Sequence, residues 1–468
     1  MRPITTQVRT RLLAVGCAAA LAAALAGCGS SGNNATPPTG STSPTGGASG
    51  SPSGSASTSA LPDLHGVSFT VLGQWTGAEQ TAFQAVLDKF DSETGAQGKY
   101  TAAAGGDEAT VLGTKVSGGN PPDIAILALP GAIAQYAKSK NLQPVGASGQ
   151  AAVKANFAGE WAKLATVNGT LYGVPVDAAD KSTVWYNAKA FSNAGISSPP
   201  TTWPQFIQDA KTLSASGVST PISVGGGDGW TLTDWFENVY IRTAGVNMYD
   251  KLTHHQIPWT DKSVTTALNT LKQVFGDPTI SGQPSKALQT SFTNSVDNVF
   301  KASPTAAEVY EASFVATTIQ GDKDPAKVGT DALFYPFPSI NGSQPVVEAS
   351  GDFASAFTTN KAAQAFMTYL AGPEAAQILV SAPESGFLSA NKNLSNSSYP
   401  DSTSAKLGQQ IVSVGDNFRF DMSDQAPASF GGTPNKGEWA DLQNFLKTGN
   451  VQATQQALEH DAKAATGW

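Results

Sequence analysis

Cysteine is nearly absent from this chain. Among its 468 residues only Cys17 and Cys28 occur, both close to the N-terminus. The rest of the chain therefore has no disulfide, no thiolate metal site and no cysteine nucleophile. The four histidines show no HExxH spacing, and no serine lies in a GxSxG motif. These absences argue against a zinc site and a hydrolase nucleophile elbow, and we expect neither a metal nor a cofactor.

Long apolar runs are also missing, apart from one near the N-terminus. Residues 12–27 (LLAVGCAAALAAALAG) follow three arginines and end directly before Cys28. The run is shorter than the ~20 apolar residues of a spanning helix, and its basic flank is typical of a signal peptide. The small residues before the cysteine resemble a bacterial lipoprotein box. We therefore expect residues 1–27 to be a removed signal peptide, Cys28 to be lipidated, and the protein to be anchored at the extracellular face of the cell membrane.

The segment 28–62 has almost nothing from which to build a core. Between residues 29 and 60 there is no charge, no aromatic ring and no aliphatic side chain larger than Ala. Such a composition cannot offset the entropy of ordering, so we expect a disordered linker behind the anchor. A Gly/Ser-rich chain of this length spans ~30 Å root-mean-square, enough to hold a folded body off the membrane.

Positive charge is in short supply. The chain has 28 Lys and Arg against 36 Asp and Glu, a formal net charge of −8, and loss of the signal-peptide arginines would leave −11. Phosphate contacts supply most nucleic-acid affinity, so an acidic body is a poor nucleic-acid binder. We expect a monomer that takes a small-molecule ligand.

Strand and helix patterns alternate after the linker, which predicts an α/β architecture. A single core stops growing near 250–300 residues, so the remaining ~400 residues predict two lobes. We expect residues 63–178 with 331–372 in the first lobe, and 179–330 with 373–468 in the second. Strands are expected at 67–72, 123–128, 171–176, 183–187 and 331–340, and helices at about 83–90, 131–136, 202–213, 361–371, 373–380 and 438–447.

The stretch GGGDGWTLTDWFE (225–237) combines glycines, two tryptophans and three acidic residues within thirteen positions. Its spacing fits neither a dinucleotide fingerprint nor a phosphate loop, because Trp stands at 230 and no lysine is present. Asp234 and Glu237 lie one turn apart on an expected helix, whereas glycosidase carboxylates usually come from separate elements. Trp230 and Asp234 share one helix face, which favours a ring platform beside a hydrogen-bond acceptor, as a sugar requires. Trp235 is expected in the core.

Ten separated motifs resemble one known family, the extracellular solute-binding proteins of ATP-binding-cassette importers, in its carbohydrate branch of α-glucoside type. The resemblance covers residues 67–446. The motifs are GQWTGAE (73–79), SGGNPPDIAILALPG (117–131), LYGVP (171–175) with VWYN (184–187), TTWPQF (201–206), GWTLTDWFE (229–237), YEASF (310–314), PFPSI (336–340), GDFASAF (351–357), GFLSANK (386–392) and FRFDMSD (418–424).

That resemblance implies a periplasmic-binding-protein-like (type II) fold, in which hinge strands join two α/β lobes around a ligand cleft. It also implies a lipid-anchored receptor that is not an enzyme and delivers a sugar, an α-glucoside or other di- or oligosaccharide, to a membrane permease. Carried over by motif, the expected cleft residues are Trp75, Glu79, Trp230, Asp234, Glu311, Asp352, Arg419 and Asp421, with Asp424 in the same motif as the last two. Trp185, Tyr186 and Trp203 could line the site or pack the core.

Two other functions are compatible with these aromatic and acidic residues. One is a surface-anchored glycoside hydrolase, which would turn over maltose- or cellobiose-type substrates. The other is an importer-binding protein for a peptide or polyamine, because a polyamine site would also be acidic and aromatic.

Overall fold

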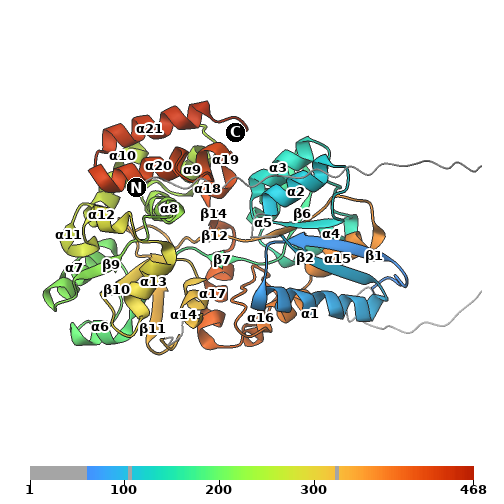
Figure 1. Ribbon diagram of the computed structural model, residues 1–468, viewed down its shortest axis with the longest axis horizontal. Helices are drawn as coiled ribbons and strands as arrows, with labels where there is room; N and C mark the ends of the chain where they lie inside the picture. The colour runs from blue at the N-terminus through green and yellow to red at the C-terminus, as the bar shows by residue number, and fades with distance from the viewer. Residues whose placement is uncertain (1–60, 104–107, 322–325) are drawn as a thin grey trace, which may run out of the picture. The chain divides into compact units, whose positions relative to one another are not determined.

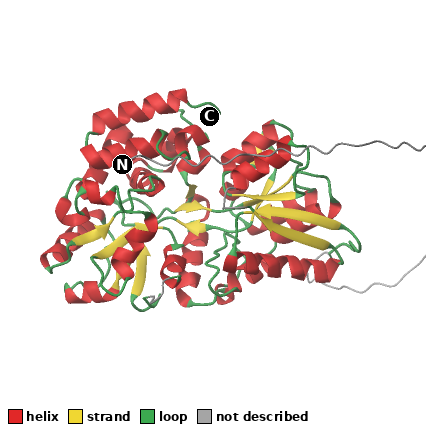
Figure 2. Cartoon of the chain, in the orientation of Figure 1, coloured by secondary structure: helices red, strands yellow, loops and turns green. Residues whose placement is uncertain are grey.

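The computed structural model describes residues 61–103, 108–321 and 326–468. The expected signal peptide, Cys28 and the linker up to residue 60 lie outside these residues. Within the described ranges, no helix is both long enough and apolar enough to cross a membrane. Figure 2 shows the strands in yellow and the helices in red.

The first sheet has five strands in the order β2-β1-β3-β13-β6. Its first three strands run parallel, and β13 runs antiparallel to both of its neighbours. The strands are β1 (Ser68–Gly73), β2 (Gln97–Ala102), β3 (Ile124–Leu127), β6 (Gly173–Pro175) and β13 (Phe353–Ala356), and the separate pair β4 (Thr166–Val167) and β5 (Thr170–Leu171) lies between α5 and β6 in sequence. The loop that carries Trp75 follows the carboxyl end of β1, where ligands bind in open α/β sheets.

Helices pack around this sheet (Figure 1). The helices of this part are α1 (Gly77–Thr94), α2 (Glu108–Ser117), α3 (Pro130–Lys138), α4 (Ala147–Asn156), α5 (Gly159–Leu164), α15 (Lys361–Leu370) and α16 (Pro373–Ser381). The expected helical stripe is confirmed in α1, whose Phe83, Val86, Leu87 and Phe90 are all buried. Pro130 begins α3, at a position where its missing N–H breaks no helical hydrogen bond.

The second sheet has four strands in the order β11-β8-β10-β9. These are β8 (Thr183–Asn187), β9 (Thr220–Ser223), β10 (Ala306–Glu311) and β11 (Ala332–Pro336). The helices that follow them in sequence or pack nearby are α6 (Ala188–Asn193), α7 (Trp203–Ala215), α8 (Trp230–Ala244), α9 (Val246–Thr253), α10 (Lys262–Phe275), α11 (Pro278–Ser281), α12 (Pro284–Ala287), α13 (Phe292–Phe300), α14 (Val315–Gln320), α20 (Gly437–Thr448) and α21 (Val451–Ala464).

A small third sheet joins segments that are distant in sequence. It orders β14 (Arg419–Phe420), β12 (Glu348–Ser350) and β7 (Ala179–Asp180), and β7 leads directly into β8. The short helices α18 (Met422–Gln425) and α19 (Ala428–Gly431) follow β14, and α17 (Ser402–Ser413) packs against β7. Two 3₁₀ turns lie beside α17, at Asn396–Ser398 and Gly415–Asn417.

Two hydrophobic clusters form the core. The first surrounds the five-stranded sheet and continues onto one face of the second sheet, where Trp185 and Val309 belong to it. The second cluster covers the opposite face, with Val184, Tyr186 and Tyr310. Alternate residues of β8 and β10 therefore enter different clusters, as the two-residue period of a strand requires.

Two of the expected lobe boundaries are wrong. Residues 332–336, expected in the first lobe, pair antiparallel with β8 in the second sheet. The helix α16, expected in the second lobe, packs against α1 and buries Leu379 and Val380 in the first cluster. The sequence pattern identified both elements, but the pairing of a strand depends on partners more than 100 residues away, which local periodicity does not encode.

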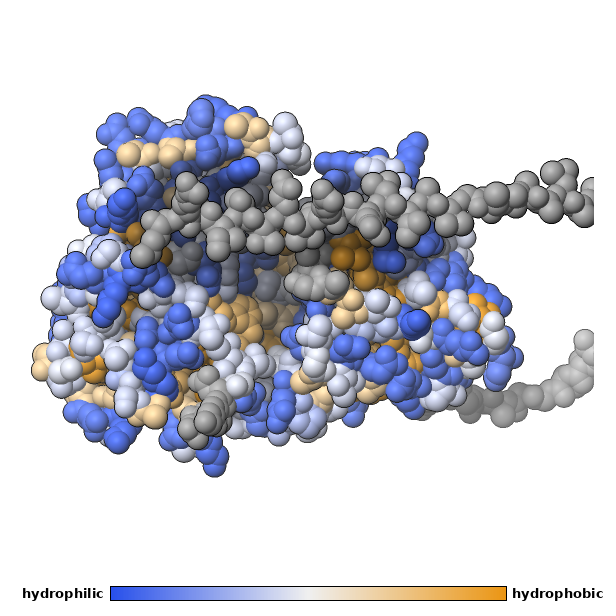
Figure 3. Space-filling model, in the orientation of Figure 1, coloured by the Kyte–Doolittle hydropathy of each residue, from blue (hydrophilic) through white to orange (hydrophobic). Residues whose placement is uncertain are grey.

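The face of the molecule shown in Figure 3 is largely hydrophilic, with hydrophobic residues in small, scattered groups. Isolated apolar residues are normal on a protein surface and do not by themselves indicate a binding site.

Candidate functional site

A glycine-rich turn sets the start of α8. Gly229 has φ 85°, a left-handed conformation that L side chains rarely adopt, and a Cβ at this position would lie 3.0 Å from Cβ of Trp439. At Gly227 a Cβ would lie 2.9 Å from the carbonyl oxygen of Thr290. Glycine is required here for close packing of the turn, not for a phosphate. The turn places Trp230 in the first position of α8.

The two tryptophans of α8 have different environments, as expected from the sequence. Trp235 is 1 % exposed and contacts the rings of Phe206, Phe275 and Tyr310 in the second cluster. Trp230 is only partly buried and lies against Phe292 and Phe314, with ring centroids 5.3 and 6.0 Å away. The core prediction for Trp235 is confirmed, and Trp230 keeps part of its surface free.

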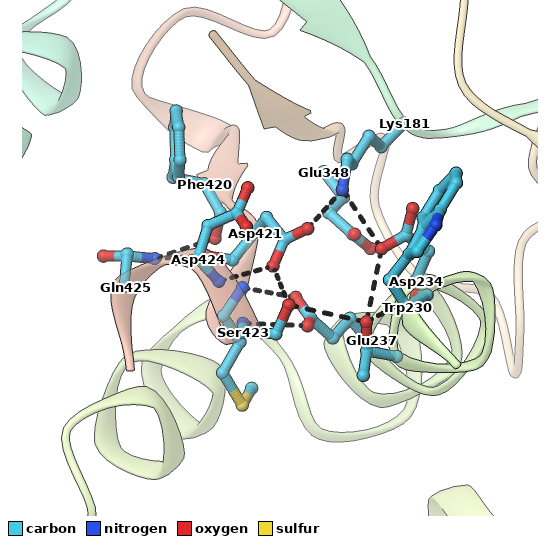
Figure 4. Close-up of polar contacts among 12 residues, drawn as sticks. Lys181, Trp230, Asp234, Glu237, Glu348, Phe420, Asp421, Ser423, Asp424 and Gln425 are labelled. Carbon is cyan, nitrogen blue, oxygen red and sulfur yellow. Dashed lines mark hydrogen bonds and ion pairs between the residues drawn. The ribbon is translucent and has the colours of Figure 1, made fainter. Parts of the chain in front are cut away.

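Lys181 lies at the centre of the polar group beside Trp230 (Figure 4). Its ammonium forms ion pairs with Asp421 and with Asp234, the latter at 3.1 Å, and lies 5.8 Å from the centre of the Trp230 ring. Trp230 and Asp234 therefore do project to the same side of α8, one helical turn apart. Five carboxyl groups surround Lys181. We call them the second acidic group, because a first one beside the loop after β1 is described below; its members are Asp234, Glu311, Glu348, Asp421 and Asp424.

Burial dominates the electrostatics of this group. It raises the pKa of Asp234 to about 7, with Lys181 lowering it and Asp421 raising it. Burial also raises the pKa of Asp421, but Lys181 and hydrogen bonds from Ser423 and the Asp424 amide reverse the shift, so that the pKa lies below the ordinary value. The pKa of Lys181 is well above its ordinary value, because the surrounding carboxylates outweigh the effect of burial. Lys181 and Asp421 therefore form a charged pair.

The buried carboxylate of Glu311 has unused hydrogen-bond acceptor positions. It is 1 % exposed, and neither of its carboxylate oxygens accepts a hydrogen bond from an N–H or O–H of the described chain. Burial, and then the charge of Asp234, raise the pKa of Glu311 well above the ordinary value. Glu311 therefore keeps acceptor positions open beside Asp234 Oδ2, which likewise has no hydrogen-bond donor in the described chain.

Glu237 has a supporting position. Its carboxylate accepts hydrogen bonds from the Tyr249 hydroxyl and from the amides of Met422 and Ser423. These bonds fix the loop that carries Asp421 and Asp424 relative to α8. Asp234 pairs with Lys181, whereas Glu237 holds the loop after β14, so the two carboxylates support different elements.

A first acidic group, Glu79, Asp177 and Asp352, lies beside the loop after β1. The amide of Asp352 donates to Asp177 Oδ1 at 2.7 Å. Burial and the charge of Glu79 raise the pKa of Asp352 to about 7, while hydrogen bonds with Trp75 and Gln74 lower it. Trp75, expected in the cleft, is 3 % exposed and packs on Phe83 and Phe387, so little of its ring surface is free.

The two acidic groups interact. Burial and the charge of Asp421 raise the pKa of Asp424 well above the ordinary value, and the charge of Asp352 contributes in the same direction. Asp424 belongs to the segment after β14, whereas Asp352 directly precedes β13 of the first sheet. The structure thus brings together, from opposite sheets, most of the residues that the motifs indicated.

Arg419 is not among the residues that the structure brings together. Its guanidinium forms a bidentate ion pair with Asp250, with N–O distances of 2.5 and 3.0 Å, and donates to the carbonyls of Asp416 and Phe418. The carboxylate of Asp250 fits the planar guanidinium and so holds the Arg419 side chain against α9. This contact stabilises the segment that precedes Asp421.

Other candidates have structural positions. Trp185 and Trp203 are buried in the two clusters, and Tyr186 stacks near Phe191. Asp123 accepts hydrogen bonds from Thr70 and Thr358 and so ties β1 to the segment after β13.

Sequence reasoning missed Lys181, Asp177 and Glu348. The signal for Lys181 was present, since it is the one cation in the segment 176–187, between Asp180 and the strand β8. Glu348 gave no local signal, because its neighbours are apolar and its place in the site depends on the pairing of β12 with β7 and β14.

Carboxylate oxygens of Asp234, Glu348 and Asp421 lie within 4.8 Å of one another, a spacing that a metal ion could use. Lys181 already pairs with two of the three. The resident ammonium supplies the positive charge that a metal would bring, so this donor set does not fit an additional cation.

Comparisons with known proteins agree on one family. A family model described as "Bacterial extracellular solute-binding protein" matches residues 74–377. The chain is 30% identical over 391 residues to the alpha-glucosides-binding periplasmic protein AglE of Rhizobium meliloti, covering 79% of this chain and 82% of that protein. It is 32% identical over 376 residues to the osmoprotective compounds-binding protein GgtB of Synechocystis, covering 77% and 85%.

Solved structures share the fold. The bacterial solute receptor AcbH superposes with a TM-score of 0.70 at 19% identity, covering 85% of this chain and 98% of that one. The two-lobe α/β fold expected from the sequence is thereby confirmed.

Proposed function

This chain belongs to the bacterial extracellular solute-binding proteins, and we propose that it binds a sugar, of the α-glucoside or another di- or oligosaccharide class, and delivers it to the permease of an ATP-binding-cassette importer. The names of its relatives support this assignment: AglE is called alpha-glucosides-binding, and a protein from Streptococcus mutans that is 25% identical over 286 residues is called a multiple sugar-binding protein. We also propose that Cys28 carries a lipid anchor and that the receptor acts as a monomer.

The observation that carries the proposal is the position of Trp230 beside unsatisfied acceptors. The partly exposed indole offers a flat apolar surface to the C–H face of a sugar ring. Beside it, Asp234 Oδ2 and both oxygens of Glu311 lack an N–H or O–H donor from the described chain. Buried acceptors without donors are costly, and the hydroxyl groups of a sugar would satisfy them. Asp352 and Glu79 of the first acidic group would contact the ligand from the opposite side.

The proposed delivery role needs no chemistry on the ligand. Lys181 neutralises Asp421 and part of Asp234, so the site keeps acceptors for hydroxyl protons without presenting a bare negative charge. This arrangement favours a neutral, hydroxyl-rich solute over a polyamine, because a second cation would face the resident ammonium at short range.

A thermal-shift panel of di- and oligosaccharides tests the assignment. A sugar at 100 times its dissociation constant should stabilise the protein by about 2.7 kcal/mol. Spermidine and a tripeptide serve as matched non-sugar ligands, and product analysis after incubation with maltose tests for hydrolysis. The assignment is wrong if only a non-sugar ligand shifts the melting temperature, or if maltose is turned over by the wild type and not by Asp234→Ala.

A further inference from the structure

A separate pocket of about 280 Å³ lies between the segment that follows Leu388 and helix α17. Its polar lining includes Ser389, Asn391, Lys392, Tyr399 and Gln409. None of these residues belongs to either acidic group, and the pocket has no part in the site described above.

Asn391 points to a ligand in this pocket. The side chain is 1 % exposed, and its Nδ2 has no hydrogen-bond partner within the described chain. Its Oδ1 accepts from the amide of Asn393 at 3.0 Å, which fixes the orientation of the amide group and leaves Nδ2 as the free donor. A buried amide donor without an acceptor is costly, so a ligand that supplies an acceptor would be stabilised here.

Two further donors line the same pocket. The Tyr399 hydroxyl accepts from the amide of Ser389 at 3.2 Å, so its own proton remains to be donated. Burial raises the pKa of Tyr399 to about 12, which keeps this proton in place at neutral pH. The Lys392 ammonium contacts the Phe157 carbonyl at 3.2 Å and has two more protons to donate.

The pocket also lacks negatively charged side chains. No Asp or Glu occurs among its ten lining residues, in a chain whose net charge is −8. Convergent donors, one cation and no carboxylate are complementary to an anion with several acceptor oxygens. We propose that this pocket is a second binding site, specific for a small oxyanion such as a phosphate or a carboxylate.

The walls of the pocket are tied to the segments that lead between the sheets. The amide of Lys392 donates to the carbonyl of Asn156 at the end of α4. On α17, Gln410, which follows the lining residue Gln409, donates to the carbonyl of Ser182, the residue after Lys181. A bound oxyanion would therefore restrain the chain beside Lys181. By linkage it would also change the affinity for the sugar. Only this effect on sugar affinity rests on the proposed function.

Isothermal titration of the folded protein with inorganic phosphate tests the pocket, in a zwitterionic buffer with sodium chloride adjusted to constant ionic strength. We expect saturable binding at one site, weakened at least tenfold in Lys392→Gln and in Asn391→Asp. Lys406→Gln removes an exposed lysine of α17 that does not line the pocket, and it should bind as the wild type does.

The outcomes separate clearly. Absence of saturable binding, or equal affinity in wild type and both pocket variants, would overturn the proposal, as would an equal loss in Lys406→Gln. If Asn391→Asp does not fold, Lys392→Gln decides, because that side chain is exposed. Titration of sugar with and without phosphate measures the coupling separately, so a failure of sugar binding leaves the phosphate result intact.

Discussion

At the scale of single residues, α8 separates recognition from stability within two turns. Trp230 and Trp235 are five positions apart, yet one lies beside Lys181 with free surface and the other lies in the core. The reason is the 3.6-residue period, which turns position 235 towards the second cluster while 230 and 234 face the polar group.

Alanine substitutions at the two positions should therefore differ in kind. Trp230→Ala should weaken sugar binding by at least ~2 kcal/mol, a factor of about 30, because the ring platform is lost while the core is untouched. Trp235→Ala should cost roughly 3–5 kcal/mol in the free energy of unfolding as a core truncation. Calorimetric titration and urea unfolding of both variants measure the two effects, and the opposite pattern would show that the helix faces are wrongly assigned.

Asp352 should make stability depend on pH. Its pKa is raised to about 7 in the folded protein, mainly by burial, so the folded state binds its proton more tightly than the unfolded state does. This stabilisation is complete below about pH 4 and is lost as the pH rises through about 7, amounting to up to ~4 kcal/mol.

Asp352→Asn keeps the shape of the side chain and removes the titration. We expect the variant to lose less stability than the wild type between pH 5 and pH 8, measured by urea unfolding at both values. Glu384→Gln, on an exposed residue, provides the control and should follow the wild type. An identical pH dependence in Asp352→Asn and wild type would mean that ionisation of Asp352 does not lower the free energy of unfolding.

At the scale of elements, the turn before α8 decides where the helix begins. Gly229 and Gly245 flank the helix with φ 85° and 83°, but their surroundings differ. A Cβ at 229 would press on Trp439, whereas a Cβ at 245 would meet nothing within 4 Å.

Alanine at these two glycines gives a matched comparison. Both glycines have positive φ in sparsely populated backbone regions, so each substitution carries strain of about 1–3 kcal/mol. Gly229→Ala should in addition displace the first turn of α8 and weaken sugar binding, while Gly245→Ala should leave the sugar affinity unchanged. Equal sugar affinities in the two variants would show that the turn does not position Trp230 and Asp234.

At the scale of the whole molecule, the two acidic groups come from different sheets and interact across the site. The charge of Asp352 raises the pKa of Asp424, so the charged carboxyl groups oppose close approach, and a ligand that donates hydroxyl protons to both groups would favour it. Binding should therefore bring the two lobes closer together.

Small-angle scattering with and without a sugar from the panel measures this change. The radius of gyration should decrease on binding in the wild type. In Trp230→Ala the decrease should require a higher sugar concentration, because the ligand is held less tightly. A radius that stays constant at saturating sugar would contradict closure on the ligand.

The sequence by itself determined the elements that depend on local pattern. The strand at 67–72, the stripe of α1, the proline starts of α3 and α16, and the different faces of Trp230 and Trp235 all follow from periods and turn residues within about ten positions. The ten motifs also identified the family and most residues of both acidic groups.

Only the tertiary structure decided which sheet each element joins and which charges meet. Residues 332–336 and α16 lie in the lobes opposite to those expected, Arg419 pairs with Asp250, and Lys181 enters the middle of five carboxyl groups. These outcomes depend on strand pairing and burial between segments that are distant in sequence; the two ion pairs of Lys181 alone join residues 53 and 240 positions apart. Side-chain burial and long-range pairing set both the pKa values and the partners, and neither can be derived from local spacing.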